Sequence, residues 1–143
     1  MAIWFERPTL EGLHDIHIGT AVAHLGIQVT EIGDDWLAGR MPVDQRTVQP
    51  YRILHGGASV LLAETLGSAG AVHCVDQARF ICVGQEINAN HLRPASTGWV
   101  TGVARPIHLG RRSQVWGIEL RDEAGRMTCI SRLTMAVLPK PAG

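Results

Sequence analysis

The feature that most constrains this chain is the stretch from Gly57 to Val75, which contains no proline and consists largely of Ala, Leu, Gly and Ser. The pattern predicts one long helix, and because it is apolar nearly all the way round, the helix should be buried on most sides. Its only formally charged side chain is Glu64. The stretch is too short and too polar to be interpreted as membrane-spanning. Other parts of the chain must therefore cover it.

Strand-like runs lie on both sides of this helix in the sequence. Two precede it and four follow it, separated by turn-forming segments such as Arg93-Pro94 and Asp122 to Gly125. This order predicts an α+β domain in which an antiparallel sheet of about six strands wraps around one long buried helix. The expected strands are residues 26–31, 36–43, 80–92, 98–107, 113–121 and 127–137, with a turn at His108-Leu109-Gly110 between the fourth and the fifth.

The rest of the chain supplies smaller elements of a single domain spanning residues 1–143. Thr9 is a suitable N-cap for a short helix of about residues 9–15, with Leu10 and Leu13 on one face. The polar segment 44–54 is expected to be a loop and the tail 139–143 to be flexible. Six strands cannot easily cover so apolar a helix and also bury the far face of the sheet, so we expect self-association.

Composition and charge exclude several classes of function. Thirteen basic and thirteen acidic side chains in 143 residues create no broad field for nucleic acid or for an anionic membrane. The N-terminal residues lack the pattern of a targeting signal. Three cysteines at unrelated spacings indicate reduced thiols in a cytoplasmic protein, and the histidines have no zinc-like spacing, so no metal site is expected. The cysteines are Cys74, Cys82 and Cys129.

Glu64 is the first candidate catalytic residue. An ionised carboxylate is costly to bury unless it is paired or hydrogen-bonded. Ser68 lies four residues further on, on the same helix face. A carboxylate and a hydroxyl side by side could activate a water molecule, or Glu64 could attack an acyl carbon directly. The alternative is a structural glutamate that merely reaches solvent or an arginine.

The segment Leu54-His55-Gly56-Gly57, which follows Gln49-Pro50, is the second candidate. Two glycines at a helix start leave backbone N–H groups uncovered, with the positive end of the helix dipole behind them. Such a site suits an oxygen that gains negative charge. His55 and Gln49 could orient a carbonyl or a leaving sulfur. The alternative here is an ordinary tight turn from loop to helix.

The spacing of the two candidates predicts a shared site. Glu64 lies eight residues beyond Gly56, which is about 12 Å along a helix. One carbonyl cannot contact both within a chain, since catalytic contacts are near 3 Å. A two-fold dimer with antiparallel helices would place Gly56 of one chain beside Glu64 of the other. We therefore expect the active site to lie across subunits and an isolated monomer to be inactive.

These residues, in this order, resemble the hotdog-fold thioesterases. The most similar branch contains the 4-hydroxybenzoyl-CoA thioesterase, the 1,4-dihydroxy-2-naphthoyl-CoA thioesterase and the enterobactin-pathway proofreading thioesterases. The resemblance covers about residues 20 to 138. The matching segments are Val22 to Ile27, Met41 to Asp44, Gln49-Pro50, Leu54 to Ser59, Ala63 to Ser68, Glu86 to His91, Arg93-Pro94 and His108 to Arg111.

The resemblance implies a role for each candidate residue. Glu64 would be the nucleophile or general base, and the Gly56 amide would polarise the thioester carbonyl. Gln49 and His55 would position the thioester, with Ser68 near the attacking water. The coenzyme A arm would be held by Gly84, His91, Leu92, Arg93, Pro94, His108, Leu109, Gly110, Arg111, Arg112 and Ser113. Leu92 departs from the His found in some relatives, which puts its own contact in doubt.

The resemblance also implies a homotetramer built as a dimer of dimers, without metal or redox cofactor, since coenzyme A is part of the substrate. An aryl or medium-chain acyl group would enter a pocket lined by Ser68 to Val72 and by facing strands. Two other functions stay open: a non-catalytic acyl-CoA-binding module and a hotdog dehydratase or hydratase. The second would need a catalytic histidine such as His55, whereas Glu64 with Ser68 favours hydrolysis.

Overall fold

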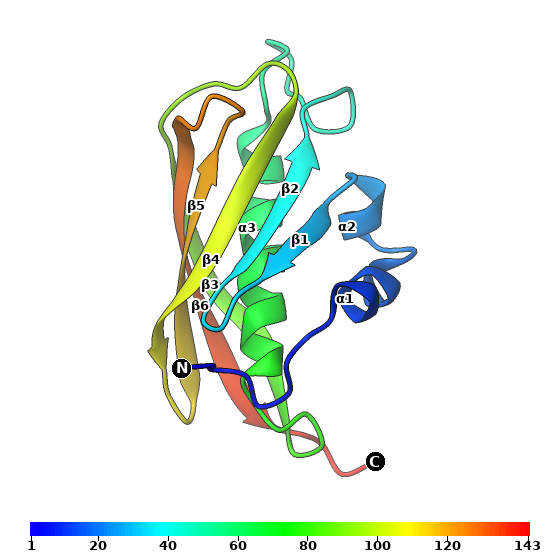
Figure 1. The fold of residues 1–143 in the computed structure, drawn as a ribbon, viewed down its shortest axis with the longest axis vertical. Coiled ribbons are helices and arrows are strands. Elements are labelled where there is room, and N and C mark those ends of the chain that lie inside the picture. Colours follow the sequence, from blue (N-terminus) through cyan, green and yellow to red (C-terminus); the bar gives the residue numbers. More distant parts are fainter.

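The computed structural model describes all 143 residues and contains one six-stranded sheet with three helices. All neighbouring strands are antiparallel, and their order across the sheet is β1-β2-β4-β5-β6-β3. The elements are α1 (Leu10–His17), α2 (Ala21–His24), β1 (Gln28–Ile32), β2 (Leu37–Pro42), α3 (Gly56–His73), β3 (Phe80–His91), β4 (Trp99–Leu109), β5 (Ser113–Arg121) and β6 (Met127–Pro139). The expected α+β architecture, a sheet curved around one long helix, is confirmed (Figure 1).

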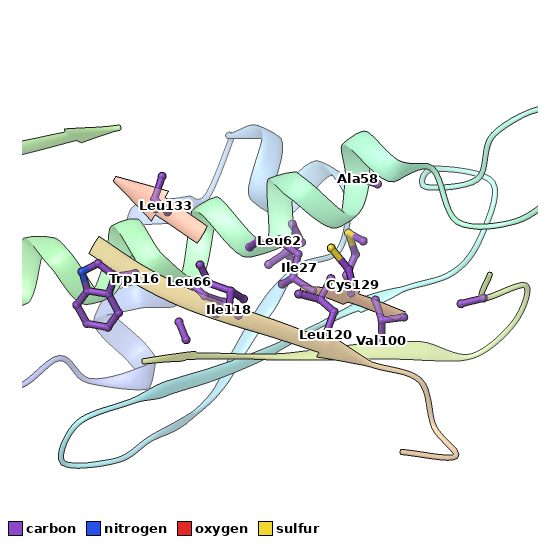
Figure 2. Close-up of a cluster of buried hydrophobic side chains, with 14 of the residues drawn as sticks. Ile27, Ala58, Leu62, Leu66, Val100, Trp116, Ile118, Leu120, Cys129 and Leu133 are labelled. Carbon is purple, nitrogen blue, oxygen red and sulfur yellow. The ribbon is translucent and has the colours of Figure 1, made fainter. Parts of the chain in front are cut away.

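The core lies between α3 and the concave face of the sheet. Leu62 and Leu66 are fully buried on α3 and point toward the strands (Figure 2). Leu66 approaches β2 and β4 where they carry Gly39 and Gly102, and an added Cβ on Gly102 would lie 2.9 Å from a Leu66 methyl. Glycine at these two strand positions lets the helix pack close to the sheet. This packing explains why α3 is apolar on most sides.

The short helix α1 begins at the predicted cap. The hydroxyl of Thr9 accepts a hydrogen bond from the Gly12 amide at 3.0 Å, and α1 then runs two residues beyond the expected end. Leu13 is buried against Leu37 and Ala69, but Leu10 is 45% exposed. Of the two leucines predicted to share one helix face, only Leu13 therefore reaches the core. The following single-turn helix α2 was not predicted.

The predicted boundaries of several strands also need correction: β1 begins at Gln28 rather than Gly26, and β4 and β6 end later than expected. β4 does not end at Ile107 but continues to Leu109, because its register with β5 shifts by one residue between Pro106 and His108 and pairing then resumes. The turn is thus confined to Gly110–Arg112, closed by a 2.9 Å bond from the Gly110 amide to the Ser113 carbonyl. β6 extends to Pro139, and the Lys140 amide donates to the Arg79 carbonyl at 2.8 Å. The structured region therefore reaches further into the tail than expected.

The sheet has two edges, β1 and β3. β3 pairs only with β6, and its residues 83–86 are exposed. At twelve residues, β3 is long for an edge strand that is left unpaired.

No helix in the structure is long and apolar enough to cross a membrane.

Candidate active site

Glu64 lies on α3 and lines a cavity of about 390 Å³ between α3 and the α1–α2 segment. Its side chain is half-buried, and no hydrogen bond or ion pair joins the carboxylate to another group of the chain. Oε1 lies directly above Gly84 of β3, where a Cβ would collide with it. The structural alternative of a glutamate paired with an arginine is therefore wrong for the single chain.

Ser68 lines the same cavity, as its position one helical turn beyond Glu64 predicts. Its hydroxyl donates only to the sulfur of Met135, at 3.7 Å. Thioether sulfur is a weak acceptor, so this hydroxyl can exchange its partner at little cost. The neighbouring Thr65 hydroxyl is instead occupied by the Leu61 carbonyl at 2.6 Å.

The start of α3 leaves one backbone amide without an acceptor. His55 is the N-cap: its Nδ1 accepts from the Gly57 amide at 2.8 Å, and its carbonyl accepts from Ala58 and Ser59 at 3.0 and 3.2 Å. The Gly56 amide has no such partner. Of the four N–H groups that a helix start leaves free, Gly56 therefore supplies the one still available to a ligand.

The hydrogen bond at Nδ1 also constrains His55 itself. A neutral imidazole that accepts at Nδ1 carries its proton at Nε2. In this tautomer Nε2 can donate a hydrogen bond but cannot remove a proton. This geometry does not suit the catalytic base that a dehydratase or hydratase would need at this position.

A second cavity, also of about 390 Å³, lies at the start of α3. The Gly56 backbone lies beside the ring of His91, whose Nε2 would be 2.7 Å from a Cβ at this position. The side-chain oxygen of Gln49 accepts from the Tyr51 amide, so only the NH₂ group of this side chain is left to donate elsewhere. The cavity combines many of the predicted site residues: Gln49, Gly56, His91, Leu92, Arg93 and Pro94.

A third cavity, of about 1010 Å³, lies near the other end of α3. It is lined by His108, Gly110, Arg111, Arg112 and Ser113 of the β4–β5 turn, all predicted to contact coenzyme A. Arg79, which was not predicted, lines it as well, and its guanidinium lies 5.2 Å from the centre of the Phe80 ring. None of these three arginines forms an ion pair within the chain. With three arginines against one acidic side chain, Asp76, the cavity is a net basic pocket suited to phosphate.

Within one chain, the candidate residues therefore form three separate groups. Glu64 and Ser68 line one cavity, the residues around Gly56 are at one end of α3, and the β4–β5 turn is at the other. Leu109 of that turn lines none of the three cavities and is 42% exposed. Since α3 is continuous, Glu64 and Gly56 stay about 12 Å apart along its axis.

The wall opposite Glu64 differs from the expected one. The cavity is lined on α3 by Ser68, Ala69 and Val72, as predicted, but no strand residue faces them. The facing wall is instead built from Ile16, His17, Ala21 and Val22 of the α1–α2 segment. Sequence reasoning missed this wall because α2 is a single turn with no periodic pattern.

Two histidines missed by sequence reasoning, His17 and His73, also line this cavity. Burial lowers the pKa of His17 below its ordinary value, an effect that the Leu13 carbonyl opposes and His14 reinforces. His17 is therefore neutral at pH 7. The Nδ1 atom of His73 lies 2.8 Å from the Ala69 carbonyl, one turn earlier in α3.

The three cysteines are free thiols. Burial raises the pKa of Cys74 to about 12, with a contribution from Cys82 nearby. Burial also raises the pKa values of Cys82 and Cys129. A thiol must ionise to act as a nucleophile, so the raised pKa values disfavour these three residues as nucleophiles.

Comparison with known proteins identifies the family. Residues 51–129 match the thioesterase superfamily. The 1,4-dihydroxy-2-naphthoyl-CoA hydrolase of Escherichia coli strain K12 is 52% identical over 136 residues, which is 95% of this chain and 99% of the relative. The proofreading thioesterase EntH of Cronobacter turicensis is also 52% identical over 136 residues, covering 95% and 98% of the two chains.

Solved structures agree with this assignment. The crystal structure of a mutant of thioesterase PA1618 from Pseudomonas aeruginosa superimposes with a TM-score of 0.96 and 49% identity, covering 97% of this chain and 100% of that one. The fold, the helix with its lone carboxylate and the relatives all agree: this chain belongs to the thioesterase superfamily and is a thioester hydrolase with the hotdog fold.

Proposed function

We propose that this chain hydrolyses acyl-coenzyme A thioesters in a site shared by two subunits, with Glu64 of one and the Gly56 amide of the other acting on the same carbonyl. The observation that carries the proposal is the unpaired Glu64 carboxylate, held over Gly84 in a largely apolar cavity. A half-buried carboxylate without a partner is unfavourable for stability. Attack on an acyl carbon, or activation of water, explains its presence.

The Gly56 amide is the proposed oxyanion donor. It is the free N–H at the start of α3, while its neighbours are bonded to His55. The helix dipole adds positive potential at the same point. A fixed donor of this kind stabilises the negative oxygen that forms when the carbonyl is attacked. The side-chain NH₂ of Gln49 and the Nε2–H of His55 are further donors close by.

The exposed edge of β3 offers a route to the shared site. Gly84 of this strand lies beside Glu64, and His91 lies beside Gly56. If two copies of β3 pair antiparallel about a two-fold axis near Ile87 and Asn88, Gly84 of one strand faces His91 of the other. Glu64 then meets the Gly56 amide of the second subunit. The two six-stranded sheets would become one continuous sheet, leaving neither β3 edge exposed.

The same pairing would join the two groups of predicted coenzyme A contacts. His91 to Pro94 follow the end of β3, whereas Arg79 and Phe80 are at its start beside the β4–β5 turn. Antiparallel pairing brings the end of one β3 against the start of the other. Arg93 of one subunit would then lie near the basic pocket of its partner, and guanidinium groups suit the phosphates of coenzyme A.

The proposed reaction converts an acyl thioester and water into a carboxylic acid and free coenzyme A. Glu64 either removes a proton from water that attacks the carbonyl, or attacks it directly to form an anhydride that water then opens. In both routes the C–S bond breaks and the sulfur leaves as thiolate, which takes up a proton. Ser68, one turn from Glu64, is placed to hold the water.

The proposal is tested by measuring coenzyme A release from benzoyl-CoA with a thiol reagent. We expect the wild-type protein to release it, and Glu64→Gln to lose several orders of magnitude in kcat while retaining its fold and its binding of benzoyl-CoA. Binding without release in the wild-type protein would instead support a non-catalytic acyl-CoA-binding module. Near-normal turnover by Glu64→Gln would exclude Glu64 as the catalytic carboxylate.

A further inference from the structure

The cavity that holds Glu64 has one wall that the reaction does not explain. Its floor is a stripe along α3 that includes Leu61, Ser68 and Val72, and its roof is the α1–α2 segment. The roof is separate from the basic pocket and from the residues around Gly56. The volume of the cavity is within the range of small-ligand sites. An acyl group bonded at the carbon that Glu64 attacks can lie in this cavity, between α3 and the roof.

Most of the polar groups in the lining are already bonded within the chain. The Thr65 hydroxyl donates to Leu61, Nδ1 of His73 is bonded to Ala69, and the Ser68 hydroxyl donates to Met135. The remaining polar side chains are Glu64 and, in the roof, His17. Six of the eleven lining residues are hydrophobic. The imidazole of His17, which also contacts the Leu13 carbonyl of its own helix, is thus the one polar group on the wall that faces the catalytic helix.

We propose that this cavity is the acyl site and that His17 is a specificity-determining residue, which hydrogen-bonds to a polar substituent of the acyl group. This inference rests on the proposed function, because the thioester must react at Glu64. In a neutral imidazole one nitrogen donates and the other accepts. With the donor directed to the Leu13 carbonyl, the second nitrogen of His17 can accept a hydrogen bond from a hydroxyl. The matching ligand is an acyl group with a hydroxyl on the part that reaches the roof.

A hydrogen bond to His17 would discriminate between acyl groups more strongly than the apolar wall does. An apolar pocket distinguishes similar acyl groups only weakly, whereas a polar group in the wall is left without its partner when an unsubstituted acyl group binds. The roof therefore selects the substrate, although it supplies no group to the reaction itself.

The test measures binding, so that it does not depend on turnover. Dissociation constants are determined by calorimetry for benzoyl-CoA and its ortho-, meta- and para-hydroxy derivatives in a Glu64→Gln background, with and without His17→Leu. We expect the unmodified roof to prefer at least one hydroxy derivative, and His17→Leu to reduce that preference about tenfold, the value of one hydrogen bond. His17→Gln, which keeps a donor and an acceptor, should restore part of it.

His14→Leu is the matched control, since His14 is exposed on the same helix and does not line this cavity. It should leave all four dissociation constants unchanged. An unchanged preference in a folded His17→Leu protein, or equal losses for all four thioesters, would overturn the role of His17. If binding follows the expectation but the wild-type protein releases no coenzyme A, the proposed function fails and the assignment of the acyl site stands. If none of the thioesters binds, both are refuted.

Discussion

Gly84→Ala should impair catalysis while sparing the fold. Gly84 lies in β3 directly beneath the Glu64 carboxylate, and a Cβ built there collides with Oε1. The position is exposed, and although the pairing of β3 with β6 shifts register just after it, the backbone at Gly84 has no positive φ. Alanine is therefore compatible with the backbone at this position. The side chain that must yield is Glu64.

The expected loss follows from the size of that displacement. To restore an ordinary contact distance, the carboxylate has to move by about 1 Å, and a misplacement of this size can reduce a rate about a hundredfold. A hundredfold loss in kcat corresponds to about 2.7 kcal/mol in the activation free energy. Steady-state kinetics with benzoyl-CoA measure the loss, and urea denaturation should show a free energy of unfolding close to that of the wild-type protein.

Two further variants make this test specific. Gly117→Ala in β5 is a matched control, because its Cβ would meet only the end of the flexible, exposed Ile107 side chain, at 3.2 Å. Its kcat should not change. Glu64→Asp shortens the carboxylate side chain, so combining it with Gly84→Ala should cost less than the product of the two single losses. Wild-type kcat in the Gly84→Ala protein would refute the reasoning, since the carboxylate would then not depend on its contact with β3.

Three other changes test separate parts of the structure. Gly56→Ala places a Cβ 2.7 Å from Nε2 of His91, so kcat should fall by at least tenfold as the free amide is displaced; an unchanged kcat would argue against this amide as the oxyanion donor. Leu66→Ala removes a fully buried side chain between α3 and the sheet. In urea titrations it should lower the free energy of unfolding by about 3–5 kcal/mol. A loss below about 1 kcal/mol would show that Leu66 does not pack in the core as described. Burial raises the pKa of Cys74 to about 12, so its thiolate is scarce until the pH approaches that value. Iodoacetamide labelling, followed by mass spectrometry, should therefore be slow in the native protein at pH 8 and fast in the unfolded one. Equal rates would show that the thiol is not buried.

The overall fold could be predicted from the sequence because the strongest pattern in the chain belongs to its central element. The apolar stretch around Glu64 cannot be a surface helix, and the strand-like runs on either side leave little choice except a sheet around it. The errors occurred where local pattern is weak. The shift between Pro106 and His108 lets β4 continue through an expected turn, and a shift in strand pairing leaves no signature in composition or periodicity.

The candidate site, like the fold, could be predicted from the sequence only in part. Glu64 and the glycines at the start of α3 could be found because each is unusual within its own segment. The family resemblance named the Gly56 amide, but the residues alone could not show which amide stays free, because this depends on His55 accepting a hydrogen bond from Gly57. The roof of the proposed acyl cavity was missed as well, since it depends on how the α1–α2 segment packs over α3. Contacts between elements far apart in the sequence were thus the least predictable part.

Mixing two inactive variants shows whether two subunits share one catalytic site. One carries Glu64→Gln and the other carries Gly56→Ala with Gln49→Ala. After unfolding and refolding together in equal amounts, random pairing gives mixed dimers in which one site has an intact Glu64 and an intact Gly56. We expect recovery of about a quarter of the wild-type activity per chain, while each variant refolded alone stays inactive. No recovery, in a mixture shown to contain mixed dimers, would place both groups in the same chain and exclude a shared site.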